Sequence, residues 1–183
     1  KEILFSKKEI LKYVQDYDKI ISQLKKSSDN INAGWKSSLT KKIEPKNSEV
    51  ILPAMTYCST AFAVLNANLK PVLVDTESMK STIDLRELKK KITKKTKVIL
   101  PVHLYGSVAN LNGIKKIINN KNIYLIDDCA QAHGAYDDSL KKYNKNKIGS
   151  TSDISCFSLY PGKNLGAYGD AGIITTNNKR LYK

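Results

Sequence analysis

The chain has 183 residues, which is enough for one domain with a hydrophobic core. Its 31 Lys and Arg residues exceed its 17 Asp and Glu residues and give a formal net charge of +14, a balance that would suit a nucleic-acid binder. Only Arg86 and Arg180 are arginines, however, and the lysines are spread along the chain, which favours solvated helix faces over a nucleic-acid groove. No apolar run approaches membrane-spanning length and no signal peptide is recognised, so we expect a cytoplasmic protein without membrane contact.

The predicted elements alternate after a polar start. Residues 7–26 have helical apolar spacing, and residues 27–46 are polar and unpatterned, as in a linker. Strands are then predicted at residues 50–52, 71–74, 97–102, 123–126, 154–159 and 172–175, with helices at 60–68, 84–92 and 111–119 and an exposed hairpin at 135–150. Strands that alternate with helices predict an α/β fold with a parallel sheet.

Ligands of such folds bind at the carboxyl ends of the strands. Thr56, Tyr57, His103 and Asp128 all fall there. The three cysteines, Cys58, Cys129 and Cys156, lie in apolar contexts without metal-ligand spacing. We therefore expect three small buried thiols in a reducing compartment, and no metal site.

Lys163 is the main candidate for chemistry. It follows an apolar, strand-like run and lies in the glycine-rich turn of residues 157–166, FSLYPGKNLG. A lysine that leaves water there can lower its pKa and become a nucleophilic amine able to form a Schiff base. Upstream, the apolar segment before Asp127 and Asp128 brings carboxylates to a strand end. An amine for an aldehyde and an anion for a ring nitrogen are what pyridoxal phosphate (PLP) requires.

Five blocks then carry a family resemblance: residues 49–57 (EVILPAMTY), 71–75 (PVLVD), 101–106 (PVHLYG), 127–135 (DDCAQAHGA) and 157–166. In this order and spacing they resemble the PLP-dependent sugar aminotransferases of the DegT/StrS type. The resemblance implies the α/β, three-layer large domain of the fold type I, aspartate aminotransferase-like transferases, here incomplete. It divides the chain into a divergent helix and linker at 1–48 and part of the PLP-binding domain at 49–183, with the family's small C-terminal domain absent.

The resemblance also implies roles for single residues. Lys163 would carry the Schiff base and move the proton, and Asp128, three residues before Gln131, would pair with the pyridine nitrogen. From the residues alone Asp127 competes for that role. Gln131 would lie near the ring face or the 3-oxygen, and Tyr57 would stack on the other face.

Ser158 would bind the cofactor phosphate. His103 and His133 lie in family-like blocks and are interpreted as structural. The Ser-Gly-Thr turn that forms most of the family's phosphate cup is not found before residue 49, and residues 37–40 only echo it.

The resemblance thus implies transfer of an amino group from an amino acid, with glutamate as the expected donor, to a nucleotide-linked keto sugar, by a homodimer when complete. Retention of Lys163, where a subset of the family has histidine and dehydrates sugars, favours transamination. Little activity is expected of the 183 residues alone. One alternative is a non-catalytic remnant that keeps the fold or binds a partner, and a basic nucleic-acid binder is another.

Overall fold

The computed structural model describes residues 47–137, 147–179 and 181, so the predicted helix at 7–26, the linker after it and the tip of the predicted hairpin lie outside the described residues. Its elements are β1 (Glu49–Pro53), α3 (Cys58–Asn66), β2 (Lys70–Val74), α4 (Leu85–Lys91), β3 (Thr96–Ile99), the 3-10 turn η2 (Leu104–Gly106), α5 (Leu111–Ile118), β4 (Tyr124–Asp128), β5 (Ile154–Ser158) and β6 (Gly172–Thr175). Every predicted strand and helix within the described ranges is confirmed in type.

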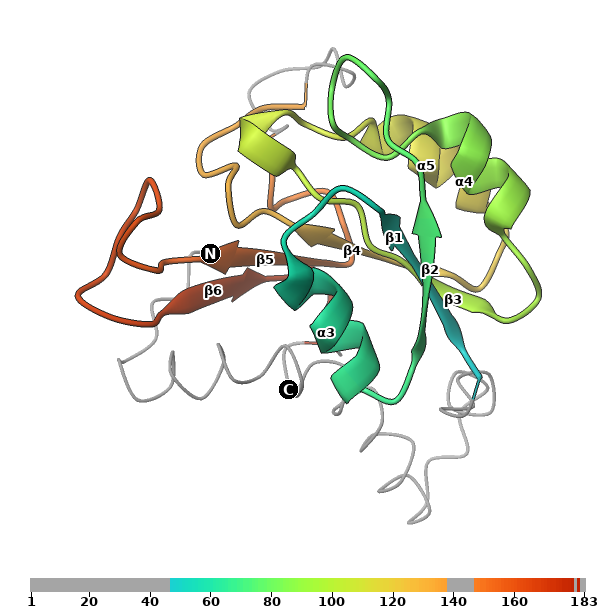
Figure 1. The fold of residues 1–183 in the computed structure, drawn as a ribbon, viewed down its shortest axis with the longest axis horizontal. Coiled ribbons are helices and arrows are strands. Elements are labelled where there is room, and N and C mark those ends of the chain that lie inside the picture. The colour runs from blue at the N-terminus through green and yellow to red at the C-terminus, as the bar shows by residue number, and fades with distance from the viewer. Residues whose placement is uncertain (1–46, 138–146, 180, 182–183) are drawn as a thin grey trace.

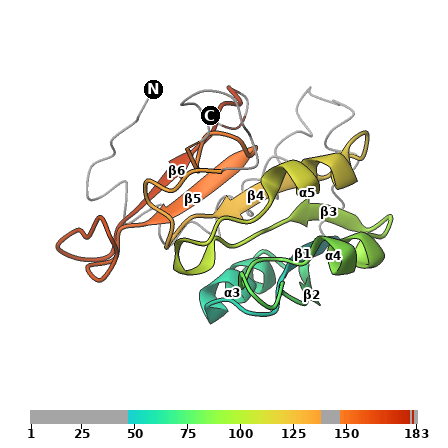
Figure 2. The ribbon, with the colours of Figure 1, turned by 90° about the horizontal axis from the view of Figure 1, so that it is seen from above.

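The strands form one sheet in the order β2-β1-β3-β4-β5-β6 (Figures 1 and 2). The strand pairs from β2 to β5 are parallel, as the alternation of strands and helices predicts. They are parallel because each connection brings the chain back to the end of the sheet at which the previous strand began. β6 departs from that pattern. It follows β5 through a loop with no helix and pairs with it antiparallel, so that Ser158 lies opposite Gly172.

Helices cover both faces of the sheet, which gives the expected three layers (Figure 1). α4 and α5 pack on one face, where Leu88 and Ile114 join a core around Ile51, Ile99 and Leu125. α3 packs on the other face, where Val64 meets a second core built on Val50, Leu52 and Ile126. Alternate residues of β1 therefore feed opposite cores, as the period of two requires.

Side-chain caps explain where two helices begin. Asp84 accepts hydrogen bonds from the backbone N–H groups of Arg86 and Glu87 before α4. Its bond with the Arg86 guanidinium, together with those N–H groups, lowers its pKa to about 2. Asn110 caps α5 by accepting from Gly113 N–H at 2.8 Å. Within the described ranges, none of the helices has both the length and the hydropathy that a membrane-crossing segment needs.

Most boundaries differ from the expectation by one or two residues, and two larger or more consequential differences and one burial prediction need comment. β3 ends at Ile99 and not at 102, since Pro101 has no N–H to give to the sheet. β4 runs on to Asp128, so both candidate carboxylates belong to the strand. The expectation of three buried thiols is wrong for Cys58, which is exposed at the start of α3, while Cys129 and Cys156 are buried.

A buried carboxylate lies at the amino-terminal end of the parallel strands. Glu49, 6% exposed, accepts a hydrogen bond from Thr93 Oγ1 at 2.6 Å and from Lys70 Nζ at 3.2 Å. The Thr93 bond is the main cause that lowers the pKa of Glu49 below its usual value of 4.5, with Lys70 adding to it and burial opposing it. The carboxylate ties the loop before β3 to β1 and β2.

We expect Glu49→Gln to flatten the acid dependence of stability. A carboxyl with a lowered pKa stabilises the fold while it is ionised, and that contribution is lost as pH falls through the folded-state value. The parent should lose stability as pH falls below about 4.5, and the variant should lose less over the same window. Urea unfolding at several pH values measures this, with Glu77→Gln, at a partly exposed glutamate, as control. An identical pH slope in parent and Glu49→Gln would contradict the assignment.

Candidate active site

Asp128 lies at the carboxyl end of β4 and is the best-held carboxylate there. Its side chain is buried, and its Oδ2 accepts from the hydroxyl of Thr60 on α3 at 2.9 Å. Its Oδ1 accepts from the N–H of Ala130 at 3.0 Å. The backbone of Asp128 is also fixed, because its N–H donates to Pro101 and its carbonyl accepts from His103 N–H. Position and orientation of the carboxylate are thus both determined.

The ionised, buried carboxylate of Asp128 would be stabilised by a cationic partner. Burial raises its pKa, whereas the bonds from Ala130 and Thr60 and the positive charge of Lys163 lower it. Lys163 is close enough for its charge to be felt, yet none of the ion pairs found among the described residues includes Asp128. A buried carboxylate with bonded donors and no counter-ion is suited to a cationic ligand group such as a protonated ring nitrogen.

Asp127 points to the opposite face of the sheet and already has a partner. Its Oδ2 lies 3.2 Å from Nε2 of His103, and both side chains are fully buried. The N–H of Ala109 donates to Nδ1 of His103 at 3.0 Å, so this imidazole is neutral and carries its proton on Nε2, which donates to Asp127. The structural interpretation of His103 agrees with this geometry.

The proton on Nε2 of His103 also decides whether this residue can bind a metal ion. His103, Asp127 and Cys129 offer donor atoms within 4.8 Å of one another, all buried. A histidine that ligates through Nε2 donates its Nδ1 proton to an acceptor. Here Nδ1 faces the N–H of Ala109, which is a donor, so Nε2 is not free to ligate. Burial moreover raises the pKa of the Cys129 thiol well above its ordinary value, which disfavours the thiolate.

Gln131 is oriented by an unusual turn. Its Oε1 accepts from the backbone N–H of Tyr105 at 2.7 Å. Tyr105 has φ 55° and Gly106 has φ 78°, so two successive left-handed residues aim that N–H at the glutamine. Because the amide oxygen is occupied, the Gln131 NH₂ group is the part of the amide left to donate to a ligand.

Lys163 lies in the loop that joins β5 to β6. Its N–H donates to the carbonyl of Tyr160 at 2.8 Å, and the loop is closed by Ala167 N–H to Leu159 O at 2.8 Å and Leu159 N–H to Ala171 O at 2.7 Å. Its side chain is only partly exposed. Ser158 ends β5, and its hydroxyl accepts from Tyr160 N–H at 3.3 Å. The lysine therefore lies in a closed turn that begins beside Ser158.

The turn depends on a glycine. A Cβ at Gly166 would lie 2.5 Å from the carbonyl oxygen of Pro161 and 3.1 Å from its carbon, both backbone atoms. A Cβ at Gly169, in the same loop, would meet nothing within 4 Å. These two glycines provide a matched pair of substitutions.

We expect Gly166→Ala to open the lysine turn at a cost of about 1–3 kcal/mol, because a methyl group cannot displace a backbone carbonyl without moving the chain. Gly169→Ala should leave the free energy of unfolding unchanged within about 0.5 kcal/mol, as for an ordinary surface substitution. Urea denaturation of the two variants and the parent measures both. Equal stability of the two variants would show that the turn does not close as described.

The remaining candidates lie around these residues. Tyr57 precedes α3, is 72% exposed and accepts from Thr60 N–H through its carbonyl. His133 packs against Phe157 with ring centroids 5.5 Å apart. Burial lowers the pKa of His133, the Ser158 backbone opposes that change, and the charge of Lys163 adds to it. Lys163 is thus an electrostatic neighbour of both Asp128 and His133.

Sequence reasoning missed two residues of this region, Thr60 and Tyr105. Thr60 is 1% exposed, and its hydroxyl lies 3.0 Å from that of Thr56, which precedes α3. The sequence offered no local signal for the bond from Thr60 to Asp128. The left-handed conformation of Tyr105 had only the following Gly106 to suggest it.

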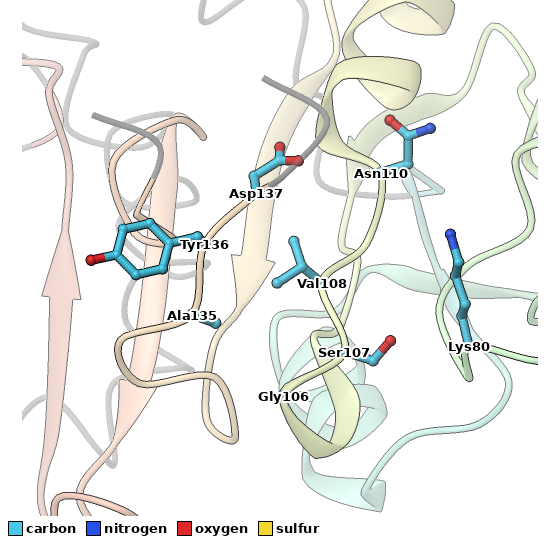
Figure 3. A pocket seen from close by; sticks show the side chains of 8 residues that line it. All are labelled: Lys80, Gly106, Ser107, Val108, Asn110, Ala135, Tyr136 and Asp137. Carbon is cyan, nitrogen blue, oxygen red and sulfur yellow. The ribbon is translucent and has the colours of Figure 1, made fainter. Parts of the chain in front are cut away.

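A hollow of about 390 Å³ lies beside the start of α5 (Figure 3). Lys80, Ser107, Asn110 and Tyr136 are among the side chains that line it. Figure 3 shows Lys80 and Tyr136 on opposite sides of the segment that carries Gly106 and Val108. None of the predicted site residues lines this hollow, but Gly106 does, and it follows Tyr105, whose N–H is bonded to Gln131.

The chain was compared with known proteins. The model of the DegT/DnrJ/EryC1/StrS aminotransferase family matches residues 33–183. The chain is 41% identical over 133 residues to the UDP-N-acetyl-3-dehydro-alpha-D-glucosamine 3-aminotransferase of Acidithiobacillus ferrooxidans, covering 73% of the chain and 34% of that protein. It is 38% identical, with the same coverage, to the dTDP-3-amino-3,4,6-trideoxy-alpha-D-glucose transaminase of Streptomyces venezuelae.

Among solved structures, DesV from S. venezuelae superposes with a TM-score of 0.69 at 34% identity over 79% of this chain and 38% of that one. NtdA from Bacillus subtilis, solved with the bound cofactor PMP, gives a TM-score of 0.70 at 31% identity over 91% of this chain and 33% of that one.

These matches define the class as PLP-dependent transferases of fold type I, whose large domain this sheet partly forms. The chain belongs to the DegT/DnrJ/EryC1/StrS aminotransferase family. It spans about a third of the length of the relatives that it matches. The expected family, fold class and cofactor are confirmed, and the assignment of single site residues stays a prediction.

Proposed function

We propose that this chain supplies the lysine and the carboxylate of a PLP-dependent sugar aminotransferase. The observation that carries the proposal is the pairing of Asp128 with Lys163. Asp128 is buried at a strand end with no ion-pair partner among the described residues, and Lys163 lies in a closed turn near enough to lower the pKa of Asp128. One group suits a cationic ring nitrogen and the other an aldehyde carbon. A neighbour solved with PMP, the amino form of PLP, supports the cofactor.

The geometry of each residue supports a particular role in this proposal. When bound, the cofactor supplies a ring that withdraws electrons from the carbon bearing the amino group. Asp128, held by Thr60 and Ala130, would keep a proton on the ring nitrogen. Lys163 would hold the aldehyde carbon and would carry protons to and from the reacting carbon. Gln131 donates through its NH₂ group, because its oxygen is bonded to Tyr105.

Two further residues take roles at the edges of the ring. Ser158, beside the lysine turn, would donate its hydroxyl to the phosphate, since that hydroxyl already accepts from Tyr160 N–H. Tyr57 has its ring exposed above the end of β1, which leaves a face free for stacking. Both assignments rest on the family motif together with these positions.

The proposed substrates are a nucleotide-linked keto sugar and an amino-acid donor, with glutamate expected. Relatives that act on UDP- and dTDP-linked sugars, as their names state, support the sugar class. A net charge of +14 is compatible with an anionic nucleotide. The homodimer and the cytoplasmic location stay predictions.

The half-reaction with glutamate tests the proposal without requiring the identity of the sugar. Because little activity is expected of the 183 residues alone, the purified chain is loaded with saturating PLP and incubated with glutamate long enough to detect one slow turnover. Formation of 2-oxoglutarate in amounts that match the bound cofactor supports the proposal. The same assay with Lys163→Ala controls for the slow reaction of free cofactor. Binding of PLP with no 2-oxoglutarate formed would instead favour the non-catalytic remnant.

A further inference from the structure

Two threonine hydroxyls, the buried one of Thr60 and the half-buried one of Thr56, lead to the carboxylate of Asp128. Thr60 is 1% exposed and donates its only hydroxyl proton to Asp128 Oδ2 at 2.9 Å. Thr56 Oγ1 lies 3.0 Å from Thr60 Oγ1. Because the Thr60 proton is committed to Asp128, the Thr56 hydroxyl must be the donor in that second bond. The three groups form a directed series that ends on the carboxylate.

The groups around Asp128 determine how strongly these hydroxyls affect its protonation. Burial favours the neutral acid, and the two groups that oppose it by direct bonding are Ala130 N–H and the Thr60 hydroxyl. The other titratable groups around it are Lys163 on the β5–β6 loop, His103 after β3, and Asp127 and Cys129 on its own segment. Of these, His103 is neutral, since its Nδ1 accepts from Ala109 N–H. Thr60 is therefore the side chain that contacts the carboxylate and favours its ionised form.

We propose that Thr60 is a positioning residue that keeps Asp128 ionised and aimed at the ring nitrogen, with Thr56 strengthening it as a donor. The role in catalysis rests on the proposed function, whereas the coupling between Thr60 and Asp128 does not. Loss of the Thr60 hydroxyl makes Asp128 take up a proton at higher pH. A neutral Asp128 cannot hold the ring nitrogen protonated, so cofactor binding and transamination then fail at a higher pH than in the parent.

The first measurement uses the 183-residue chain without cofactor. The carboxyl carbon of Asp128 is followed by NMR through a pH titration and identified by its absence in Asp128→Asn. Thr60→Val, which keeps the shape and removes the hydroxyl, should raise the titration midpoint by about one pH unit, a tenfold change in proton affinity. Thr60→Ser should restore the parent midpoint. Thr56→Val should raise it by less.

Thr96→Val is the matched control. Thr96 is likewise buried and hydrogen-bonded, but at the opposite end of the sheet, where its hydroxyl accepts from Thr93 N–H. Its removal should leave the Asp128 midpoint in place. If Thr60→Val does not fold, Thr60→Ala deletes the same hydroxyl without new bulk. An unchanged midpoint in the hydroxyl deletions, or the same rise in Thr60→Ser, overturns the inference.

The second measurement separates the inference from the proposed function. PLP uptake is titrated against pH in the parent, Thr60→Val and Thr60→Ser, by absorbance of the protein-bound cofactor. As the pH is lowered, Thr60→Val should lose its bound PLP at a higher pH than the parent and Thr60→Ser do. That result supports the positioning role in cofactor binding. A parent that takes up no PLP at any pH overturns the proposed function and this role with it, while the NMR midpoints decide the Thr60–Asp128 coupling separately. Identical pH profiles in all three proteins overturn the positioning role alone.

Discussion

Lys163→Arg is expected to abolish transamination, with a loss of about 10²–10⁴-fold or more from the missing acid–base step alone. A guanidinium keeps the positive charge felt by Asp128 and His133, yet it cannot bind the aldehyde carbon or release a proton near neutral pH. The variant therefore separates chemistry from electrostatics. The glutamate half-reaction measures the loss.

Covalent labelling gives a second measurement at the same residue. Borohydride reduction of the PLP-loaded parent, followed by peptide mapping, should place the pyridoxyl group on Lys163 and leave Lys163→Arg unlabelled. Lys116→Arg, an exposed lysine on α5, should label and react as the parent does. Labelling spread over many lysines would refute the role of the turn at residues 160–167.

Asp128→Asn should slow the glutamate half-reaction by roughly 10²–10³-fold, the usual effect of removing one charged group that stabilises a transition state. An amide cannot keep the ring nitrogen protonated, so the ring loses its power to withdraw electrons. Asparagine can still accept from Ala130 N–H through its one carbonyl oxygen, and its NH₂ group can donate to the Thr60 hydroxyl in place of accepting from it, which keeps the local contacts. We therefore expect a large fall in the rate of the half-reaction with little change in the free energy of unfolding.

Asp127→Asn should show the reverse pattern. Asp127 lies on the other face of the sheet and is bonded to His103, so its replacement disturbs a fully buried pair and not the site. We expect it to lower the free energy of unfolding by about 1–3 kcal/mol while the rate per folded molecule changes little. Equal rate losses in the two variants, after correction for the folded fraction, would mean that the wrong carboxylate was assigned.

The sequence predicted the parallel part of the sheet well because hydrophobic period and turn residues report local structure. Choosing Asp128 over Asp127 needed the family motif. The strand pattern does place the two on opposite faces, but it does not say which face holds His103. The direction of β6 could not be predicted either. A short strand after a glycine-rich loop carries no sign of whether it returns parallel or antiparallel.

Side-chain partners were harder still. The bond from Thr60 to Asp128 joins residues 68 positions apart, and no local pattern encodes it. The bond from Tyr105 N–H to Gln131 depends on a backbone conformation that tyrosine rarely adopts. Burial of Cys129 followed from its apolar context, whereas the same reasoning failed for Cys58, whose helix position faces solvent.

The loop between β5 and β6 consists of two parts with different tolerance to change. The bond from Ala167 to Leu159 closes a ring of backbone around Lys163, and the bond from Leu159 to Ala171 closes the outer part separately. Tyr168 lies in that outer part and is fully exposed. With the exposed Cys58 replaced by serine, Tyr168→Cys carrying a fluorescent dye would therefore place the dye in the same hairpin as the lysine while leaving the inner ring intact. Position 168 is thus suitable for attaching an optical reporter of ligand binding.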